Sequence, residues 1–102
     1  MAKLVEVTVF KPAAGKMNDA LGVCSEVKSY LLKNGVDEVW YNTGTIGRHF
    51  GCIISYQVFA SGEQSGKIND ALNGDKSYAA LVNKMNEMGE FISHDSYYQT
   101  NI

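Results

Sequence analysis

The chain opens with alternating apolar and polar residues and then changes to apolar spacings of three and four. Val5, Val7 and Val9 recur with a period of two, which predicts a strand over residues 4–10. Between residues 16 and 33 the apolar side chains form one helical stripe, and Asn34-Gly35 is a typical helix end. The same patterns predict strands over 37–43, 52–60 and 91–100, a short helix from Gly66 that Asn73-Gly74 ends, and a longer helix that Asp75 or Ser77 caps and Gly89 closes.

Nearly the same seven residues occur once in each half of the chain, as GKMNDAL at 15–21 and GKINDAL at 66–72. Each copy follows a strand that ends in Val-Phe and then a loop, which in the second half covers residues 61–66. We therefore expect each copy to begin a helix, so that the chain consists of two βαβ halves in tandem. The alternative is that two segments solve the same helix-start problem with similar residues.

Whether the two segments are a repeat or two similar helix starts, the predicted order of elements is strand, helix, strand, strand, helix, strand. Right-handed crossovers then place the helices on one face of a four-stranded antiparallel sheet, which is the α+β, ferredoxin-like arrangement. A chain of 102 residues has the length of one small domain, so we predict a single domain over residues 1–102.

Alternation along the strands also divides the sheet into two faces. One set is almost entirely apolar, and we expect it beneath the helices: Val5, Val7, Val9, Val39, Tyr41, Cys52, Ile54, Tyr56 and Val58. The other set mixes large aromatic residues with hydrogen-bonding groups and is typical of an interface: Glu6, Thr8, Phe10, Trp40, Asn42, Ile53, Ser55, Gln57 and Phe59. We therefore predict a homodimer in which two sheets close an eight-stranded barrel, with a monomer as the alternative. Because a shift of one residue exchanges the two faces, the pattern leaves open which face holds a cavity.

Composition and charge narrow the classes of partner. Lysines and acidic residues are scattered and give a net charge of −2, so no basic stripe for nucleic acid is present. The longest uncharged stretch, residues 50–62, is too short to span a bilayer, and no signal peptide is visible before the first strand. Cys24 and Cys52 stand far apart without a motif, and we expect two reduced thiols in a cytoplasmic protein.

The second half of the chain is similar to a known superfamily. Residues 41–92 read YNTGTIGRHFGCIISYQVFASGEQSGKINDALNGDKSYAALVNKMNEMGEFI, which gives a glycine-containing hairpin, an uncharged strand, a short helix ending in ALNGD and a helix leading into the last strand. This pattern resembles the dimeric α+β-barrel superfamily, in particular its NIPSNAP-like and antibiotic-biosynthesis-monooxygenase-like branches. The first half of the chain matches this superfamily only in the order of its strands and helix. The resemblance implies a fold more than a function, since the superfamily includes monooxygenases, isomerases, heme-degrading enzymes and proteins of unknown role.

The familiar catalytic signatures are missing from the sequence. No G-x-S-x-G elbow, phosphate loop or dinucleotide fingerprint occurs, and the glycines at 44, 47 and 51 lie between two strands with the wrong spacing. His49 and His94 are far apart and have no companion at metal-ligand spacing. We therefore predict no metal and no cofactor. A heme, which the resemblance allows, would have His94 as its candidate ligand.

His94 is the leading candidate for a functional side chain. If Ile92, His94, Ser96 and Tyr98 point toward the helices, His94 places a titratable group in an otherwise apolar layer. Imidazole suits a polar anchor there because it can donate or accept a hydrogen bond near neutral pH. A satisfied or solvated surface histidine is the alternative.

Tyr41 and Tyr56 would face the same layer, where their hydroxyls could orient a carbonyl or carboxylate, although both could equally be ordinary core aromatics. Arg48, the single arginine, could bind an anionic head group or the partner subunit, or lie in solvent. The candidate ligand-binding set is Val7, Tyr41, Arg48, Tyr56, Leu81, Met85 and His94, and the candidate catalytic set is His94, Tyr56 and Asn42.

Three functions remain open on these observations. The first is binding of a small hydrophobic molecule, including one with an acyl chain of the fatty-acid type, between sheet and helices. The second is a cofactor-independent monooxygenase that acts on a small aromatic substrate, as the resemblance permits. The third is a structural module that dimerises without a ligand. The absence of a cluster of acids and bases favours binding over catalysis, and whether the protein is an enzyme stays undecided.

Overall fold

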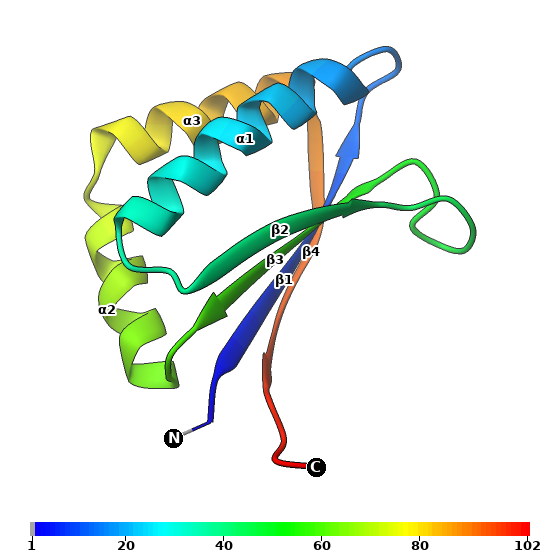
Figure 1. Cartoon of the computed structure of the whole chain (residues 1–102). Coiled ribbons are helices and arrows are strands. Elements are labelled where there is room, and N and C mark those ends of the chain that lie inside the picture. Colours follow the sequence, from blue (N-terminus) through cyan, green and yellow to red (C-terminus); the bar gives the residue numbers. More distant parts are fainter. Residues whose placement is uncertain (1) are drawn as a thin grey trace.

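The computed structural model describes residues 2–102 and consists of one sheet with a layer of helices. The elements are β1 (Leu4–Pro12), α1 (Met17–Lys33), β2 (Glu38–Thr43), β3 (Ile53–Phe59), α2 (Gly62–Asn73), α3 (Lys76–Met88) and β4 (Gly89–Tyr98). Figure 1 shows the helices gathered on one side of the sheet, and the described chain places no helix or strand over the other side. The predicted α+β, ferredoxin-like arrangement is confirmed.

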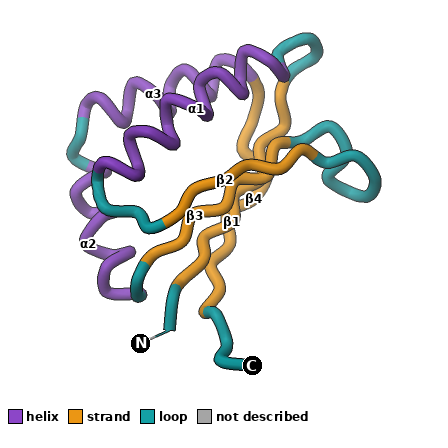
Figure 2. Tube along the Cα trace, viewed as in Figure 1, coloured by secondary structure: helices purple, strands orange, loops and turns teal. Residues whose placement is uncertain are grey.

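The four strands lie in the order β2-β3-β1-β4, and every neighbouring pair is antiparallel (Figure 2). The register between β1 and β4 shifts once, because Val9 lies opposite Ser93 while Phe10 lies opposite Phe91. Ile92 is therefore the extra residue of a β-bulge. The bulge allows both Phe91 and His94 to lie on the helix side of β4, which strict alternation would forbid.

The start of α2 differs from the prediction. Residues 61–66 were expected to form a loop, but α2 begins at Gly62. Ser61 has extended backbone angles, and its hydroxyl accepts a hydrogen bond from the Gln64 backbone N–H at 3.1 Å, which caps the helix one turn earlier. The first copy of the repeat thus lies at the start of α1, whereas the second lies within α2. Asp75 is the N-cap of α3, which is one of the two caps that the sequence predicts.

The face assignment of the two central strands was wrong. The helix side carries Leu4, Glu6, Thr8 and Phe10 from β1 and Ile53, Ser55, Gln57 and Phe59 from β3. The valines of β1 lie on the uncovered side, where Val7, Val9, Cys52, Ile54 and Tyr56 form a separate apolar cluster. Val39 and Tyr41 of β2 do face the helices, as expected. A period of two separates the faces of a strand, but it does not tell which face the helices cover.

The core beneath the helices is divided into two clusters. One joins the ends of β1 and β3 to α2 and the end of α1 and includes Leu4, Leu31, Val36, Val39, Phe59, Ile68 and Leu72. The other joins the opposite ends of the same strands to α1 and α3 and includes Phe10, Ala20, Val23, Cys24, Ile53 and Met85. Polar residues occupy the middle of both strands between the clusters, so the layers do not close into one dry core. No helix within residues 2–102 is long and apolar enough to cross a membrane.

Candidate functional site

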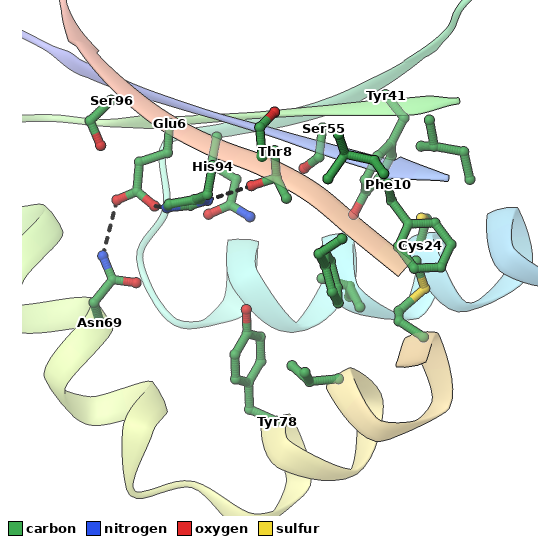
Figure 3. Close-up of a pocket in the computed structure, with 18 residues that line it drawn as sticks. Glu6, Thr8, Phe10, Cys24, Tyr41, Ser55, Asn69, Tyr78, His94 and Ser96 are labelled. Carbon is green, nitrogen blue, oxygen red and sulfur yellow. Dashed lines mark hydrogen bonds and ion pairs between the residues drawn. The ribbon is translucent and has the colours of Figure 1, made fainter. Parts of the chain in front are cut away.

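A cavity of about 740 Å³ lies between the sheet and the helices. Its floor is the helix side of all four strands, and its roof is formed by side chains of α1, α2 and α3 (Figure 3). The roof consists of Cys24, Val27, Asn69, Tyr78, Val82 and Met85. A volume of this size falls within the range of pockets that hold drug-sized molecules.

A row of polar side chains crosses the floor of the cavity from one edge of the sheet to the other. The register aligns Tyr41 of β2, Ser55 of β3, Thr8 of β1 and His94 of β4. All four line the cavity. Apolar Phe10, Ile53 and Phe91 border this row on one side, and on the other side lie Glu6, Gln57 and Ser96. The floor is therefore divided into a polar part and an apolar part.

Glu6 is the centre of the polar part. The residue is only 5% exposed, and its carboxylate is held by three side chains. The Ser65 hydroxyl and the Asn69 amide of α2 both donate to Oε2, at 2.7 and 3.0 Å. His94 Nε2 lies 3.2 Å from Oε1. Because a buried carboxylate without partners would cost several kcal/mol, these contacts are what allow Glu6 to lie beneath the helices.

His94 connects the buried carboxylate to the open side of the cavity. Its Nδ1 lies 2.6 Å from the Thr8 hydroxyl oxygen, and its side chain is 57% exposed. Neutral imidazole satisfies both neighbours when Nε2–H donates to Glu6 and Nδ1 accepts from the Thr8 hydroxyl. The chain Thr8–His94–Glu6 (Figure 3) is then a continuous hydrogen-bonded path from the cavity floor to a fixed negative charge.

The apolar part of the cavity is lined by larger side chains. Phe10 and Phe91 meet edge to face with ring centroids 5.1 Å apart. Met85 approaches from α3 and Cys24 from α1. Burial raises the pKa of the Cys24 thiol to about 11, so this group is neutral at physiological pH and acts as part of an apolar wall.

Two tyrosine hydroxyls also belong to the cavity. Burial, followed by the neighbouring Cys24 and Tyr78, raises the pKa of Tyr41 far above its ordinary value. Burial and the nearby Glu6 carboxylate raise the pKa of Tyr78 in the same direction. The Tyr41 hydroxyl is buried and has no hydrogen-bond partner among residues 2–102. Both phenols therefore stay protonated, and one of them has an unused donor.

The structure brings together some of the residues singled out in the sequence and separates others. Tyr41, Met85 and His94 line the cavity, together with Ser96, which the alternation of the last strand placed beside His94. Leu81 packs against the second core cluster and borders a shallow groove between α1 and α3 instead.

Four further candidates lie away from the cavity. Val7 and Tyr56 are on the uncovered face of the sheet, because the faces of β1 and β3 are exchanged relative to the prediction. Asn42 lies opposite Ile54 and shares that face. Arg48 is exposed in the connection between β2 and β3.

Sequence reasoning missed Glu6, Thr8, Ser65 and Asn69. A signal for the first two is present along the central strands, because the helix side of both has apolar residues at its ends and polar residues in its middle. A continuous core would be apolar throughout, so this pattern indicates a cavity with a polar floor. Ser65 and Asn69 approach Glu6 only through the tertiary fold and give no local signal. No group of three or more metal-ligating side chains occurs within the described part of the chain.

Comparison with known proteins gives a likeness of structure rather than of sequence. No protein-family model matches the chain, and no curated protein sequence matches it. Among solved structures, a NIPSNAP family protein from Agrobacterium tumefaciens is 18% identical with a TM-score of 0.78, covering 97% of this chain and 87% of that chain.

Two other solved structures carry the names of oxygenases. A mutant of SnoaB, a cofactor-independent oxygenase from Streptomyces nogalater, is 7% identical with a TM-score of 0.74, covering 98% of this chain and 94% of that chain. A candidate antibiotic biosynthesis monooxygenase from Chloroflexus aurantiacus is 9% identical with a TM-score of 0.70, covering 97% and 94%. The chain thus has the ferredoxin-like fold of NIPSNAP family and antibiotic-biosynthesis-monooxygenase-like proteins, as the resemblance of its second half indicates.

Proposed function

We propose that the cavity binds a small, neutral, largely apolar molecule that donates a hydrogen bond at its Glu6–His94 side. The observation that carries this proposal is the division of one cavity into an apolar part and a converging polar part. Apolar walls with a few precisely placed polar groups are the usual composition of small-molecule sites.

The charge of Glu6 selects among the hydrophobic ligands that the sequence left open. A fatty-acid carboxylate at the polar end would face a buried carboxylate that already accepts from Ser65, Asn69 and His94. Two neighbouring carboxylates repel each other, and the low polarity of the site strengthens the repulsion. A phenol or alcohol hydroxyl can instead donate a hydrogen bond to the Glu6 carboxylate. We therefore favour a hydroxyl-bearing ligand over an anionic acyl chain.

A matched set of ligands tests this proposal. The protein should bind 2-naphthol about tenfold more tightly than 2-naphthoate in calorimetric titrations at pH 7, because a hydrogen bond to a charged group contributes about 1.5–3 kcal/mol. Glu6→Gln should reduce this preference about tenfold, and Glu63→Gln on the exposed side of α2 should leave it unchanged. Tighter binding of 2-naphthoate by the unaltered protein would contradict the proposal.

We propose in addition that the uncovered sheet face is the interface of a homodimer. On this face Val5, Val7 and Tyr56 are partly exposed beside the buried Val9 and Ile54, and Trp40 stacks on Tyr56 with centroids 4.8 Å apart. The outer strands add polar residues at the margins, including Asn42 and Asp95. An apolar centre with a polar rim is the anatomy of a protein interface, and a two-fold axis through the centre would bring apolar surface against apolar surface.

A cofactor-independent oxygenase is the second candidate, and the Thr8–His94–Glu6 chain favours it. A substrate hydroxyl that donates to Thr8 would pass its proton through that hydroxyl to His94 Nδ1, and Glu6 would stabilise the imidazolium that forms. The resulting phenolate or enolate is the electron-rich form that reacts with O₂. The likeness in fold to a cofactor-independent oxygenase is consistent with such chemistry.

Oxygen consumption with anthrone tests this second candidate, because the balanced reaction converts anthrone and O₂ to anthraquinone and water. We expect His94→Asn to lower the rate at least about a hundredfold, the usual contribution of a positioned base. His49→Asn, which alters the other histidine in the loop before β3, is the control and should retain the full rate. Equal rates for the two variants would rule out His94 as the base.

A further inference from the structure

The repeated segments GKMNDAL and GKINDAL place their asparagines in different surroundings. Asn18, from the first copy, is exposed on α1, whereas Asn69, from the second, lines the cavity and donates to the Glu6 carboxylate. Ser65, one turn before Asn69 on the same helix, is buried and donates to the same carboxylate. Figure 3 shows Asn69 reaching from α2 toward Glu6 on β1. In the second copy the asparagine thus belongs to the cavity as well as to a helix.

Asn69, Ser65 and Glu6 form a closed ring of hydrogen bonds. The Asn69 amide donates to Glu6 Oε2 at 3.0 Å and to the Ser65 hydroxyl oxygen at 3.1 Å, and the Ser65 hydroxyl donates to Oε2 at 2.7 Å. Both donors of α2 are therefore directed at one carboxylate oxygen. This arrangement suits an ionised carboxylate, which only accepts hydrogen bonds, better than a neutral carboxyl group, whose own hydrogen needs an acceptor.

The charge of Glu6 has few other sources of support. Among residues 2–102 no lysine or arginine pairs with it, and the one titratable group in contact is His94, at 3.2 Å. The remaining titratable groups that line the cavity are the Cys24 thiol of α1 and the Tyr41 and Tyr78 phenols of β2 and α3, all of which stay neutral. The charged side chains of α2 are exposed. The ionised state of Glu6 therefore depends on His94 and on the two neutral donors of α2.

The ring also distinguishes the two oxygens of Glu6. Oε2 accepts two hydrogen bonds from α2, whereas Oε1 accepts only from His94 and keeps a further acceptor site. We propose that Ser65 and Asn69 are positioning residues that keep Glu6 ionised, hold its Oε1 beside His94, and thereby make the cavity prefer a hydrogen-bond donor to an anion. This inference rests on the proposed function. It applies to both candidate functions, because ligand selection and a base at His94 each need a negative Glu6.

Infrared spectroscopy of the ligand-free protein tests the positioning role. The difference spectrum between each protein and its Glu6→Gln counterpart isolates the Glu6 carboxyl group. At about pH 6 the unaltered protein should show only carboxylate bands, and Ser65→Ala combined with Asn69→Leu should add the band of a protonated carboxyl group, because burial without donors disfavours the charge. Asn18→Leu is the same change in the exposed copy of the segment and should leave the spectrum unaltered.

Ligand preference gives a second readout on the same proteins. The preference for 2-naphthol over 2-naphthoate should fall at least about fivefold in the double variant at pH 7, since a hydrogen bond to a neutral carboxyl group is weaker than one to a carboxylate. Asn69→Leu alone keeps the Ser65 donor, so its preference should lie between that of the double variant and that of the unaltered protein. Asn18→Leu should keep the full preference.

The outcomes separate this inference from the proposed function. A folded double variant that keeps both its carboxylate bands and its ligand preference would overturn the inference while the cavity remains a binding site. An equal spectral change in Asn18→Leu would overturn it as well. If the spectrum changes as expected but the unaltered protein binds neither naphthol, the proposed function fails and the positioning role is supported. Should the double variant not fold, Asn69→Leu alone decides between the same results.

Discussion

Val7→Glu is expected to convert a dimer into a folded monomer. Val7 lies at the centre of the uncovered face and is opposite Asp95 in the register, so a glutamate there places two negative charges side by side. An unpaired charge buried in an interface costs about 3–5 kcal/mol, which weakens association at least about a hundredfold. Sedimentation velocity should show the mass falling from twice 11.2 kDa to that of one chain.

Leu32→Glu is the matched control for this prediction. Leu32 is also a partly exposed apolar residue, at 42% exposure, but it belongs to α1 on the helix side of the molecule. The same substitution there should leave the mass of the assembly unchanged. Circular dichroism should show that both variants keep their secondary structure. A wild-type protein that sediments as a stable monomer at high concentration would remove the basis for the barrel.

Val82→Trp is expected to abolish binding of 2-naphthol while the protein stays folded. Val82 is part of the α3 wall of the cavity, and an indole at this position would occupy the space proposed for the ligand. The cavity is large enough to accept the ring without forcing the core apart, so the thermal midpoint should change little. Affinity should fall about a hundredfold or more, equivalent to about 2.7 kcal/mol.

The neighbouring residue provides the comparison for Val82→Trp. Asn83 is exposed on α3, so Asn83→Trp adds the same side chain outside the cavity and should leave affinity unchanged. Binding that survives in folded Val82→Trp would place the ligand elsewhere on the molecule. Equal losses in both variants would point to a general effect of the added indole on α3.

The order of strands and helices could be predicted because each element has a clear hydrophobic period. Val5, Val7 and Val9 mark β1 through alternation, and the apolar stripe of residues 16–33 marks α1 almost to the residue. The early start of α2 was missed because glycine and serine in residues 61–66 look like a loop. A side-chain cap at Ser61 outweighs that composition.

The site could be predicted only in part, for two physical reasons. The first is that the more apolar face of β1 and β3 was assumed to lie beneath the helices, whereas it lies on the uncovered side. The prediction therefore placed Glu6 and Thr8 outside the cavity and Val7 and Tyr56 inside it. The second is distance along the chain, because the hydrogen bond from Asn69 to Glu6 joins residues 63 positions apart.

The alternation of β1 has a consequence for how the protein can change over time. Even-numbered positions such as Glu6 and Thr8 border the cavity, while Val7 and Val9, one peptide away, belong to the opposite surface. Substitutions that alter the cavity lining and substitutions that alter the opposite sheet face can therefore be selected independently at adjacent codons. A library that varies only the even positions of this strand would change the cavity lining while leaving the opposite face as it is.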